Sequence, residues 1–276
     1  MQRAADTLQN AGIPDPKTDA ALLLAHVTGL ERLELSLRGA EELSTEQEQR
    51  LSSLLFSRAS RRPLQYILGK QGFYGLSFQV DERVLVPRPE TETLCEIAIA
   101  YLRGLSGTPR VLDLCTGSGA IAVTLAHECP TIHVTAADVS RDALDVAESN
   151  AHKNNVHIRF LQGDFLAPVT GERFHCITCN PPYIESEVCL TLQEEVLQEP
   201  LLALDGGADG LDFYRRLAKE GAAHLEPGGL LCMEIGATQG DAVCALLEES
   251  RAYRDITVHP DLAGLPRVVC ARSSPT

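Results

Sequence analysis

The chain has 276 residues, of which 44% are hydrophobic and 22% are charged, as is typical of a globular protein with one large domain or with a small and a large domain. No apolar run approaches the roughly 18 residues of a membrane-spanning helix. The first ten residues resemble neither a signal peptide nor a transit peptide, so we expect a cytoplasmic protein without a membrane partner. Residues 1–80 hold nine of the 24 basic and nine of the 38 acidic side chains, so the net charge of −14 arises from 15 basic and 29 acidic side chains in residues 81–276. A surface this acidic repels phosphate backbones, and we expect no direct binding of nucleic acid.

Cysteine is frequent, with nine residues scattered along the chain, most of them inside apolar segments. This distribution favours free, buried thiols in a reducing compartment over a disulfide framework. Cys176 and Cys179 have the spacing of a redox or zinc pair, but they fall within a predicted strand, where residues i and i+3 point to opposite faces. No second pair of this kind and no clustered histidine pair completes the set, so we predict no metal site.

The first part of the chain has helical patterns and no residues that indicate chemistry of their own. Asp19, or Thr18 before it, is a candidate cap for the first clearly periodic helix. Ser44, with Gln47 three residues later, has the pattern of a capping box and opens a second helix. We therefore predict a small helical domain over residues 1–70.

A stretch rich in aromatic and β-branched residues follows, with the sequence FYGLSFQVDERVLVPRPETE over residues 73–92. Hydrophobic and polar residues alternate in it, and Asp81 and Glu82 lie between its two halves. We predict a β-hairpin over residues 71–89 that links the helical domain to a larger domain over residues 90–276.

The rest of the chain alternates between strand-like and helix-like patterns. We predict strands over 110–114, 132–137, 158–162, 174–179, 230–235, 255–259 and 267–271, and helices over 91–103, 119–128, 141–152, 210–224 and 238–250. This alternation is typical of an α/β fold, in which helices cover both faces of a mostly parallel sheet.

A glycine-bearing turn joins the first of these strands to its helix, in the sequence VLDLCTGSGAIAVTLA over residues 111–126. Glycine lets a backbone approach a bound ligand closely without steric cost, and the start of the next helix offers unpaired N–H groups and a positive dipole end. Gly117, Gly119 and Ala122 fit the relaxed dinucleotide fingerprint, which is a weak signal when it stands alone.

Acidic residues stand at or just after the C-terminal ends of the first three predicted strands, at Asp113, Asp138 and Asp164. Asp138 lies 19 residues after Gly119, where a carboxylate that binds a ribose is expected, and Phe165 beside Asp164 can stack on a base. Because open α/β sheets bind ligands along this edge, these residues predict a site for a nucleotide-type cofactor. A dinucleotide and S-adenosylmethionine both satisfy the pattern.

The fourth predicted strand ends in the sequence CNPPYI, residues 179–184, on the same edge of the sheet. Each proline forces the residue before it toward extended backbone. Neither proline has an N–H, so the segment offers two acceptors, the Asn180 side-chain oxygen and the Pro181 carbonyl. Two acceptors in fixed geometry suit a planar –NH2 group, since they bind both of its hydrogens and hold its nitrogen in line with a methyl donor, while Tyr183 can cover the group by stacking. An isolated NPP would indicate no more than a turn after a strand.

This combination of motifs resembles the protein-glutamine N5 methyltransferases of the HemK/PrmC type. NPPY after the fourth strand is also found in adenine-N6 DNA methyltransferases, but several stretches are similar to the glutamine enzymes specifically. These are VLVPRPETE (84–92), DLCTGSGAIAV (113–123), NPPYI (180–184), EPLLALDGGADGLDFYRRL (199–217) and DLAGLPRVV (261–269). The resemblance spans essentially the whole chain. It implies a Rossmann-like, mostly parallel class I S-adenosylmethionine-dependent methyltransferase sheet, with a small helical N-terminal domain joined by a β-hairpin.

The resemblance also implies a reaction, a partner and a set of site residues. A methyl group would pass from S-adenosylmethionine to the side-chain amide nitrogen of the glutamine in the Gly-Gly-Gln motif of peptide-chain release factors, which act in translation termination. The helical part and the hairpin would hold the release factor at a distance from the chemistry. Asn180 and Pro181 would be catalytic and would bind the glutamine amide, in a slot shaped by Pro182 and Tyr183. The implied cofactor-binding residues are Cys115, Thr116, Gly117, Ser118, Gly119, Asp138, Asp164, Phe165 and Asn180.

The sequence departs from the family pattern at Cys115, where the family usually has glycine. Gly117 and Gly119 are intact, so we expect the loop to tolerate the change. Within PRPETE two interpretations stay open. Glu90 and Glu92 can be acids that favour a helix N-terminus, or residues 88–91 can help to close the cofactor pocket.

Three other functions compete with this prediction. An adenine-N6 methyltransferase acting on DNA or RNA shares the –NH2 target, but it should carry a basic groove, which the acidic balance of residues 81–276 disfavours. A dinucleotide-dependent oxidoreductase uses the same kind of loop, but it has no use for NPPY. A non-catalytic scaffold that binds release factors would not need an intact NPPY either.

Overall fold

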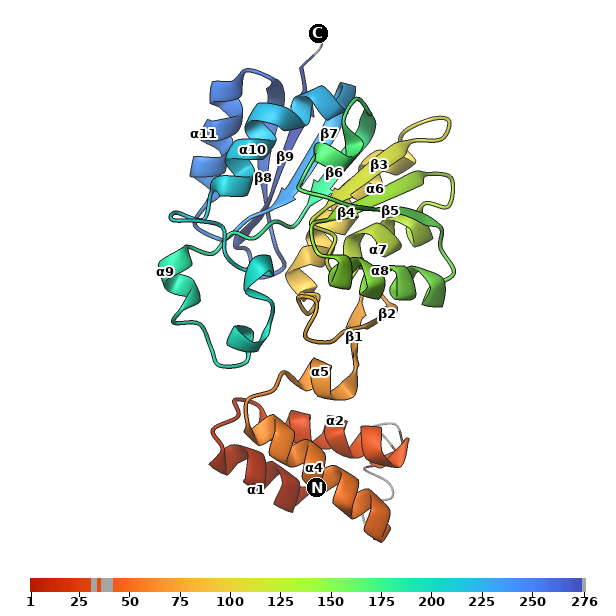
Figure 1. Cartoon of the computed structure of the whole chain (residues 1–276), viewed down its shortest axis with the longest axis vertical. Coiled ribbons are helices and arrows are strands. Elements are labelled where there is room, and N and C mark those ends of the chain that lie inside the picture. The colour runs from red at the N-terminus through yellow and green to blue at the C-terminus, as the bar shows by residue number, and fades with distance from the viewer. Residues whose placement is uncertain (31–33, 36–41, 275–276) are drawn as a thin grey trace. The chain divides into compact units, whose positions relative to one another are not determined.

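The structure, a computed structural model, describes residues 1–30, 34–35 and 42–274 (Figure 1). The predicted helical domain also includes residues 31–33 and 36–41, which lie outside the described residues. The chain divides into two compact units, one made of residues 1–70 and 193–198, the other of residues 71–192 and 199–276. Within the described part of the chain, no helix combines the length and the apolar character needed to cross a membrane.

The smaller unit is a set of helices around one apolar core. Its elements are α1 (Gln2–Asn10), α2 (Pro16–Thr28), α4 (Thr45–Ala59), α5 (Leu64–Leu68) and the 3-10 turn η3 (Val196–Gln198). The capping box is confirmed, because Ser44 Oγ accepts from Gln47 N while the Gln47 side chain accepts from Ser44 N. The predicted cap of α2 was wrong. Asp15 caps this helix, because Pro16, with its fixed φ and missing N–H, suits the first helical position, so the helix begins ahead of Asp19.

A buried ion cluster joins the segment 193–198 to α2 and α4 within the smaller unit. Arg58 Nε donates to Asp19 Oδ2 at 2.7 Å, and its Nη1 donates to Glu195 Oε1 at 3.0 Å. Arg61 also donates to Glu195, at 3.2 Å. Charges this buried persist only when they are paired. The cluster therefore explains why Glu195, 137 residues from Arg58 in sequence, folds with the helices.

The β-hairpin has its turn earlier than predicted. Strands β1 (Lys70–Phe73) and β2 (Leu76–Gln79) pair in a two-stranded sheet. Tyr74 and Gly75 form the turn, not Asp81 and Glu82, and their φ values of 49° and 74° suit the right-handed twist of paired strands. The second half of the predicted hairpin contains prolines, which cannot donate to a strand ladder, and it forms no strand.

The larger unit contains a seven-stranded sheet with the order β5-β4-β3-β6-β7-β9-β8 (Figure 1). Its strands are β3 (Arg110–Leu114), β4 (His133–Asp138), β5 (Ile158–Gln162), β6 (Phe174–Cys179), β7 (Leu225–Glu234), β8 (Tyr253–Pro260) and β9 (Pro266–Ser273). The strands from β5 to β7 in this order are parallel, and β9 is antiparallel to both of its neighbours. The predicted α/β fold with a mostly parallel sheet is confirmed, and β7 begins ahead of the predicted residue 230.

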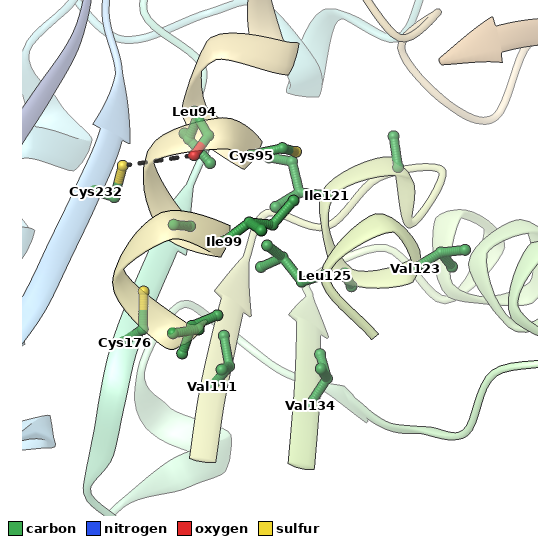
Figure 2. Close-up of a cluster of buried hydrophobic side chains, with 14 of the residues drawn as sticks. Leu94, Cys95, Ile99, Val111, Ile121, Val123, Leu125, Val134, Cys176 and Cys232 are labelled. Atoms are coloured by element: carbon green, nitrogen blue, oxygen red, sulfur yellow. Dashed lines mark hydrogen bonds between the residues drawn. The ribbon is translucent and has the colours of Figure 1, made fainter. Parts of the chain in front are cut away.

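Helices cover both faces of this sheet. The helices of this unit are α6 (Glu92–Arg103), α7 (Ala120–Glu128), α8 (Arg141–Lys153), α9 (Ser186–Cys189), α10 (Asp212–Glu220) and α11 (Gly240–Ser250), with 3-10 turns η1 (Pro89–Thr91), η2 (Ala167–Val169), η4 (Leu201–Ala203) and η5 (Gly221–His224). Residues of α6 and α7 belong to one buried cluster, shown over β3 and β4 in Figure 2, and residues of α10 and α11 belong to another. Cys176 lies in the first cluster and Cys179 in the second, which confirms that this pair points to opposite faces.

The strand order places a ligand site at one point of the sheet. From β3 the chain continues to β4 on one side, whereas β6 pairs with β3 on the other side. Open α/β sheets bind ligands at such a reversal, outside the C-terminal ends of the strands. The loops that follow β3, β4 and β6 meet there.

Candidate active site

A pocket lies at this reversal and has a volume of about 1230 Å³ including its open mouth, enough for a small-molecule ligand. Nine of the residues implied by the family resemblance line it: Cys115, Thr116, Gly117, Ser118, Asp138, Asp164, Phe165, Asn180 and Pro182. Gly119, Pro181 and Tyr183 adjoin these residues in sequence without lining the pocket. The structure thus brings together the glycine loop, the acids and the NPPY segment.

The loop after β3 turns sharply into α7 through residues with left-handed backbone. Cys115, Gly117 and Gly119 have φ values of 54°, 53° and 79°. Glycine adopts this conformation at little cost. At Gly119 it also avoids a clash, since an added Cβ would lie 3.1 Å from the Cβ of Ala147 on α8. The loop therefore leads directly to the N-terminus of α7, where the first N–H groups have no partner within the helix.

The conformation of Cys115 explains the glycine that the family usually has there. A residue with a side chain loses roughly 1–2 kcal/mol in left-handed backbone. Cys115 is half-buried and lines the pocket. In spite of this backbone strain, the chain therefore has a thiol on the pocket wall. Burial, with a further contribution from the neighbouring Cys115, holds the pKa of the Cys179 thiol well above its ordinary value. Cys179 is therefore an uncharged core residue.

Asp138 stands at the end of β4 with its carboxylate held by the backbone. It accepts hydrogen bonds from Gly117 N and from Ser140 N, each at 2.9 Å. Burial raises its pKa, and these backbone donors oppose that rise. A carboxylate has about four acceptor positions, so Asp138 keeps the capacity to accept from the hydroxyl groups of a ligand.

Asp113 differs from the other two acids because it does not line the pocket. It is fully buried, and the hydroxyl groups of Thr116 and Thr178 each donate to it at 2.7 Å. Burial raises its pKa to about 7, although both hydrogen bonds oppose the shift. Asp113 therefore links the start of the loop to β6 and stabilises the site without lining the pocket.

Asp164 and Phe165 are joined to α10 by one arginine. Arg216 donates to both oxygens of Asp164 at 2.9 Å and lowers the pKa of this carboxyl. Its guanidinium lies 4.4 Å from the centre of the Phe165 ring, and Phe213 contacts the same ring edge-on. The fold thus fixes Phe165 as part of the pocket wall, while the role of Asp164 toward a cofactor stays a prediction.

The Asn180 side chain enters a buried hydrogen-bond network. Its Nδ2 donates to Thr91 Oγ1 at 3.3 Å, and Thr91 Oγ1 donates to Glu234 Oε2 at 2.5 Å. The Tyr183 hydroxyl lies 3.5 Å from Glu234 Oε1. Burial raises the pKa of Glu234 to about 7, against the opposing effects of Thr91 and Arg267. Thr91 belongs to residues 88–91, which one interpretation of PRPETE placed at the cofactor pocket, whereas Glu234 was not among the predicted site residues.

Glycine backbone supports the NPPY segment from behind. An added Cβ on Gly206 would lie 2.7 Å from Tyr183 Cα and 2.8 Å from Pro182 O, and one on Gly210 would lie 2.3 Å from Tyr183 O. Gln239 Nε2 donates to Tyr183 O at 2.9 Å and to Gly210 O at 3.2 Å. Sequence reasoning missed these three residues; the DGGADG stretch was the available signal for the two glycines, and it does not include Gln239.

The PRPETE stretch has both a structural and a pocket-facing part. Glu199 is buried, accepts from Val86 N at 2.9 Å and pairs with Arg88. Arg88 and Thr91 line the pocket, as the second interpretation of this stretch proposed. Glu92 instead accepts from the backbone N–H of the hairpin turn at Tyr74, so it stabilises the turn.

The side chains and the loop that line the pocket suit a nucleoside that carries a positive charge. Asp138 offers acceptors to ribose hydroxyls, the glycine loop permits close approach, and Ile121 and Phe165 supply apolar surface beside them. Asn180 and its neighbours then place acceptors for a second group at the edge of the same pocket. The fold and this pocket define a class I methyltransferase, a class of enzymes that take the methyl group from S-adenosylmethionine.

Comparison with known proteins agrees with this class and narrows it. Residues 1–69 match the PrmC N-terminal domain, and residues 99–209 match the methyltransferase small domain. The chain is 41% identical to a release factor glutamine methyltransferase of Deinococcus radiodurans, over 99% of this chain and 96% of that protein, and 43% identical to one of Moorella thermoacetica, over 98% and 96%. A methyltransferase structure from Pyrococcus furiosus, 20% identical, has a TM-score of 0.53 over 82% of this chain and 99% of that chain, which shows the shared fold. The chain belongs to the release factor glutamine methyltransferase family.

Proposed function

We propose that this chain transfers a methyl group from S-adenosylmethionine to the side-chain amide nitrogen of the glutamine in the Gly-Gly-Gln motif of peptide-chain release factors. Its reaction partner is then a protein, and its place of action is the cytoplasm, where translation terminates. Neither a membrane nor a nucleic acid takes part in this reaction. The observation that carries the proposal is the position of Asn180 and Pro182 on the wall of the glycine-loop pocket, in a chain of this family.

Asn180 and Pro181 hold the reacting amide in this proposal. The Asn180 side-chain oxygen and the Pro181 carbonyl accept the two hydrogens of the glutamine –NH2 group, which fixes the plane of that group and the direction of its nitrogen. Positioning of this kind can remove about 7–11 kcal/mol of a barrier without a strong base. Pro182 and Tyr183 shape the slot, and the glycines behind Tyr183 keep it from shifting.

The residues of the glycine loop and the two pocket acids hold the cofactor. Cys115, Thr116, Gly117, Ser118 and Gly119 approach it with backbone, while Asp138 binds ribose hydroxyls. Asp164, Phe165 and Asn180 complete the wall around it. S-adenosylmethionine supplies an activated methyl group at this position.

A labelling experiment tests the proposed substrate. The chain is incubated with methyl-labelled S-adenosylmethionine and a release factor, and in parallel with the same factor carrying Glu in place of the motif glutamine. We expect label in the first factor and none in the second. Label in both factors, or in nucleic acid and neither factor, would contradict the proposal.

Replacing the asparagine should separate chemistry from cofactor binding. Asn180→Ala removes one of the two acceptors, so we expect turnover to fall by about 100-fold or more, in line with the loss of a precisely placed group at a reacting centre. Binding of S-adenosylmethionine, measured by calorimetry, should fall far less than turnover, because the loop and Asp138 are intact. Wild-type turnover in this variant would show that the amide is not held by Asn180.

A further inference from the structure

Three residues from distant parts of the chain form one line of hydrogen bonds that ends at Asn180. Glu234 ends β7, Thr91 ends η1, and Asn180 follows β6. Thr91 and Glu234 are only 4% and 2% exposed, so water does not compete for their hydrogen bonds. Their separation in sequence is 143 residues. These hydrogen bonds connect Glu234, at the end of β7, to Asn180, whose side chain lines the pocket.

The direction of each hydrogen bond in this line follows from counting protons. A threonine hydroxyl has one proton to donate and two positions at which to accept. Thr91 gives its proton to Glu234 Oε2 at 2.5 Å, a short bond of the kind that charged acceptors make. Thr91 can therefore only accept from Asn180, and it does so from Nδ2 at 3.3 Å. The amide of Asn180 is thereby fixed with its nitrogen on Thr91 and its oxygen free.

We propose that Thr91 and Glu234 are positioning residues that hold the Asn180 amide with its oxygen available to the substrate. This inference rests on the proposed function, in which Asn180 must accept a hydrogen bond from an –NH2 group. If the Asn180 amide were rotated by half a turn, its Nδ2 would face the substrate instead of its oxygen. Two hydrogen-bond donors, Nδ2 and the substrate –NH2 group, would then face each other. When it is ionised, Glu234 prevents this because a carboxylate then only accepts, which leaves Thr91 no proton for the Asn180 oxygen.

The surroundings of Glu234 keep its carboxylate in place. The Tyr214 hydroxyl on α10 donates to the Glu234 carbonyl at 2.8 Å. Arg267 on β9 donates to the carbonyl of the next residue, Ile235, at 3.3 Å, and its charge favours the ionised form of Glu234. Glu90, just before Thr91, has the opposite electrostatic effect. The network is thus anchored on two elements besides β7.

A matched pair of variants tests the role of the hydroxyl group. Thr91→Val keeps the shape of the side chain and removes both the donor and the acceptor, whereas Thr91→Ser keeps them. We expect kcat toward the release factor to fall about 10- to 100-fold in Thr91→Val, as for a misplaced reacting group, with most of it restored in Thr91→Ser. Glu234→Gln, which can donate to Thr91, should also lower kcat. In all three variants the affinity for S-adenosylmethionine should change far less than kcat.

A second readout does not depend on turnover. In the wild type, the side-chain amide protons of Asn180, assigned in NMR spectra by their absence in Asn180→Asp, should include one that exchanges slowly with water. That protection should be lost in Thr91→Val and kept in Thr91→Ser. A wild-type chain that methylates no release factor would contradict the proposed function alone, since the exchange measurement still decides the orientation of Asn180.

Two results would overturn the inference. One is unprotected Asn180 amide protons in the wild type, or protection that survives in Thr91→Val. The other is an equal loss of turnover in Thr91→Val and Thr91→Ser, which would point to packing rather than to the hydroxyl group.

Discussion

Glu234 is a carboxyl group almost removed from water. Its hydrogen bond from Thr91 and the charge of Arg267 favour the ionised form, but burial outweighs them and raises its pKa from 4.5 to about 7. The folded protein therefore favours the neutral form relative to the unfolded chain. The stabilising contribution is complete below pH 4.5 and is lost as the pH rises through about 7.

This pKa gives a prediction for stability against pH. Replacing Glu234 by Gln removes the ionisation, so the variant should gain stability relative to the wild type as the pH rises from about 4.5 to about 8. The relative gain should be about 2–4 kcal/mol, from the size of the pKa shift. Denaturant unfolding at several pH values measures it. A difference between the two proteins that does not change with pH would show that Glu234 titrates normally.

Single residues also show where sequence reasoning works and where it stops. Asn180 and Asp138 could be predicted, because each directly follows or ends a strand whose apolar pattern is clear. The pairing of Thr91 with Glu234 could not, since it depends on how β7 and η1 meet in space. Asp113 has the same local pattern as Asp138, yet burial beneath the loop gives it a supporting role.

At the scale of elements, the glycines of the segment after the NPPY motif set how rigid the site is. Gly206 and Gly210 lie so close to the backbone of Pro182 and Tyr183 that no side chain fits between them. Gln239 Nε2 joins the two stretches of backbone, because it donates both to Tyr183 O and to Gly210 O. The two prolines therefore fix the shape of the segment, while this backing fixes its position.

A pair of glycine variants isolates that backing. Gly210→Ala places a Cβ 2.3 Å from Tyr183 O at a φ of 70°, whereas Gly264→Ala has a similar φ of 81° with no atom within 4 Å. Both variants lose roughly 1–2 kcal/mol from backbone strain, so any further loss in Gly210→Ala reports the contacts with Tyr183 and with Gln239. We expect Gly210→Ala to be clearly less stable and less active than Gly264→Ala, measured by thermal unfolding and turnover. Equal effects would contradict the role given to Gly210.

The order of the elements followed from the sequence, but some of their boundaries did not. Every predicted strand of the large sheet is present, because apolar strands and amphipathic helices alternate with clear turn residues between them. The hairpin turn was misplaced, since Asp81 is a strong turn former while Tyr74 is not. The positive φ that Tyr74 adopts follows from the pairing of β1 with β2 and from the hydrogen bond that its backbone N–H donates to Glu92.

At the scale of the whole molecule, one stretch of the chain contributes residues to both compact units. Residues after the NPPY motif run through Glu195, which belongs to the smaller unit by its bonds to Arg58 and Arg61. Four residues later, Glu199 belongs to the larger unit, where it binds Val86 and Arg88 beside the pocket. The helix-like and strand-like patterns predicted the helical and α/β parts, whereas nothing in the local sequence marks 193–198 as part of the helical unit.

The central claim is that this chain methylates a glutamine side chain of a protein. Peptide mass spectrometry of a release factor, after incubation with the chain and S-adenosylmethionine, tests it most directly. We predict a mass increase of one methyl group in place of a hydrogen, located by fragmentation on the glutamine of the Gly-Gly-Gln motif and missing when Asn180→Ala replaces the wild type. A methyl group on another residue, or an unmodified motif beside a methylated nucleic acid, would contradict the account.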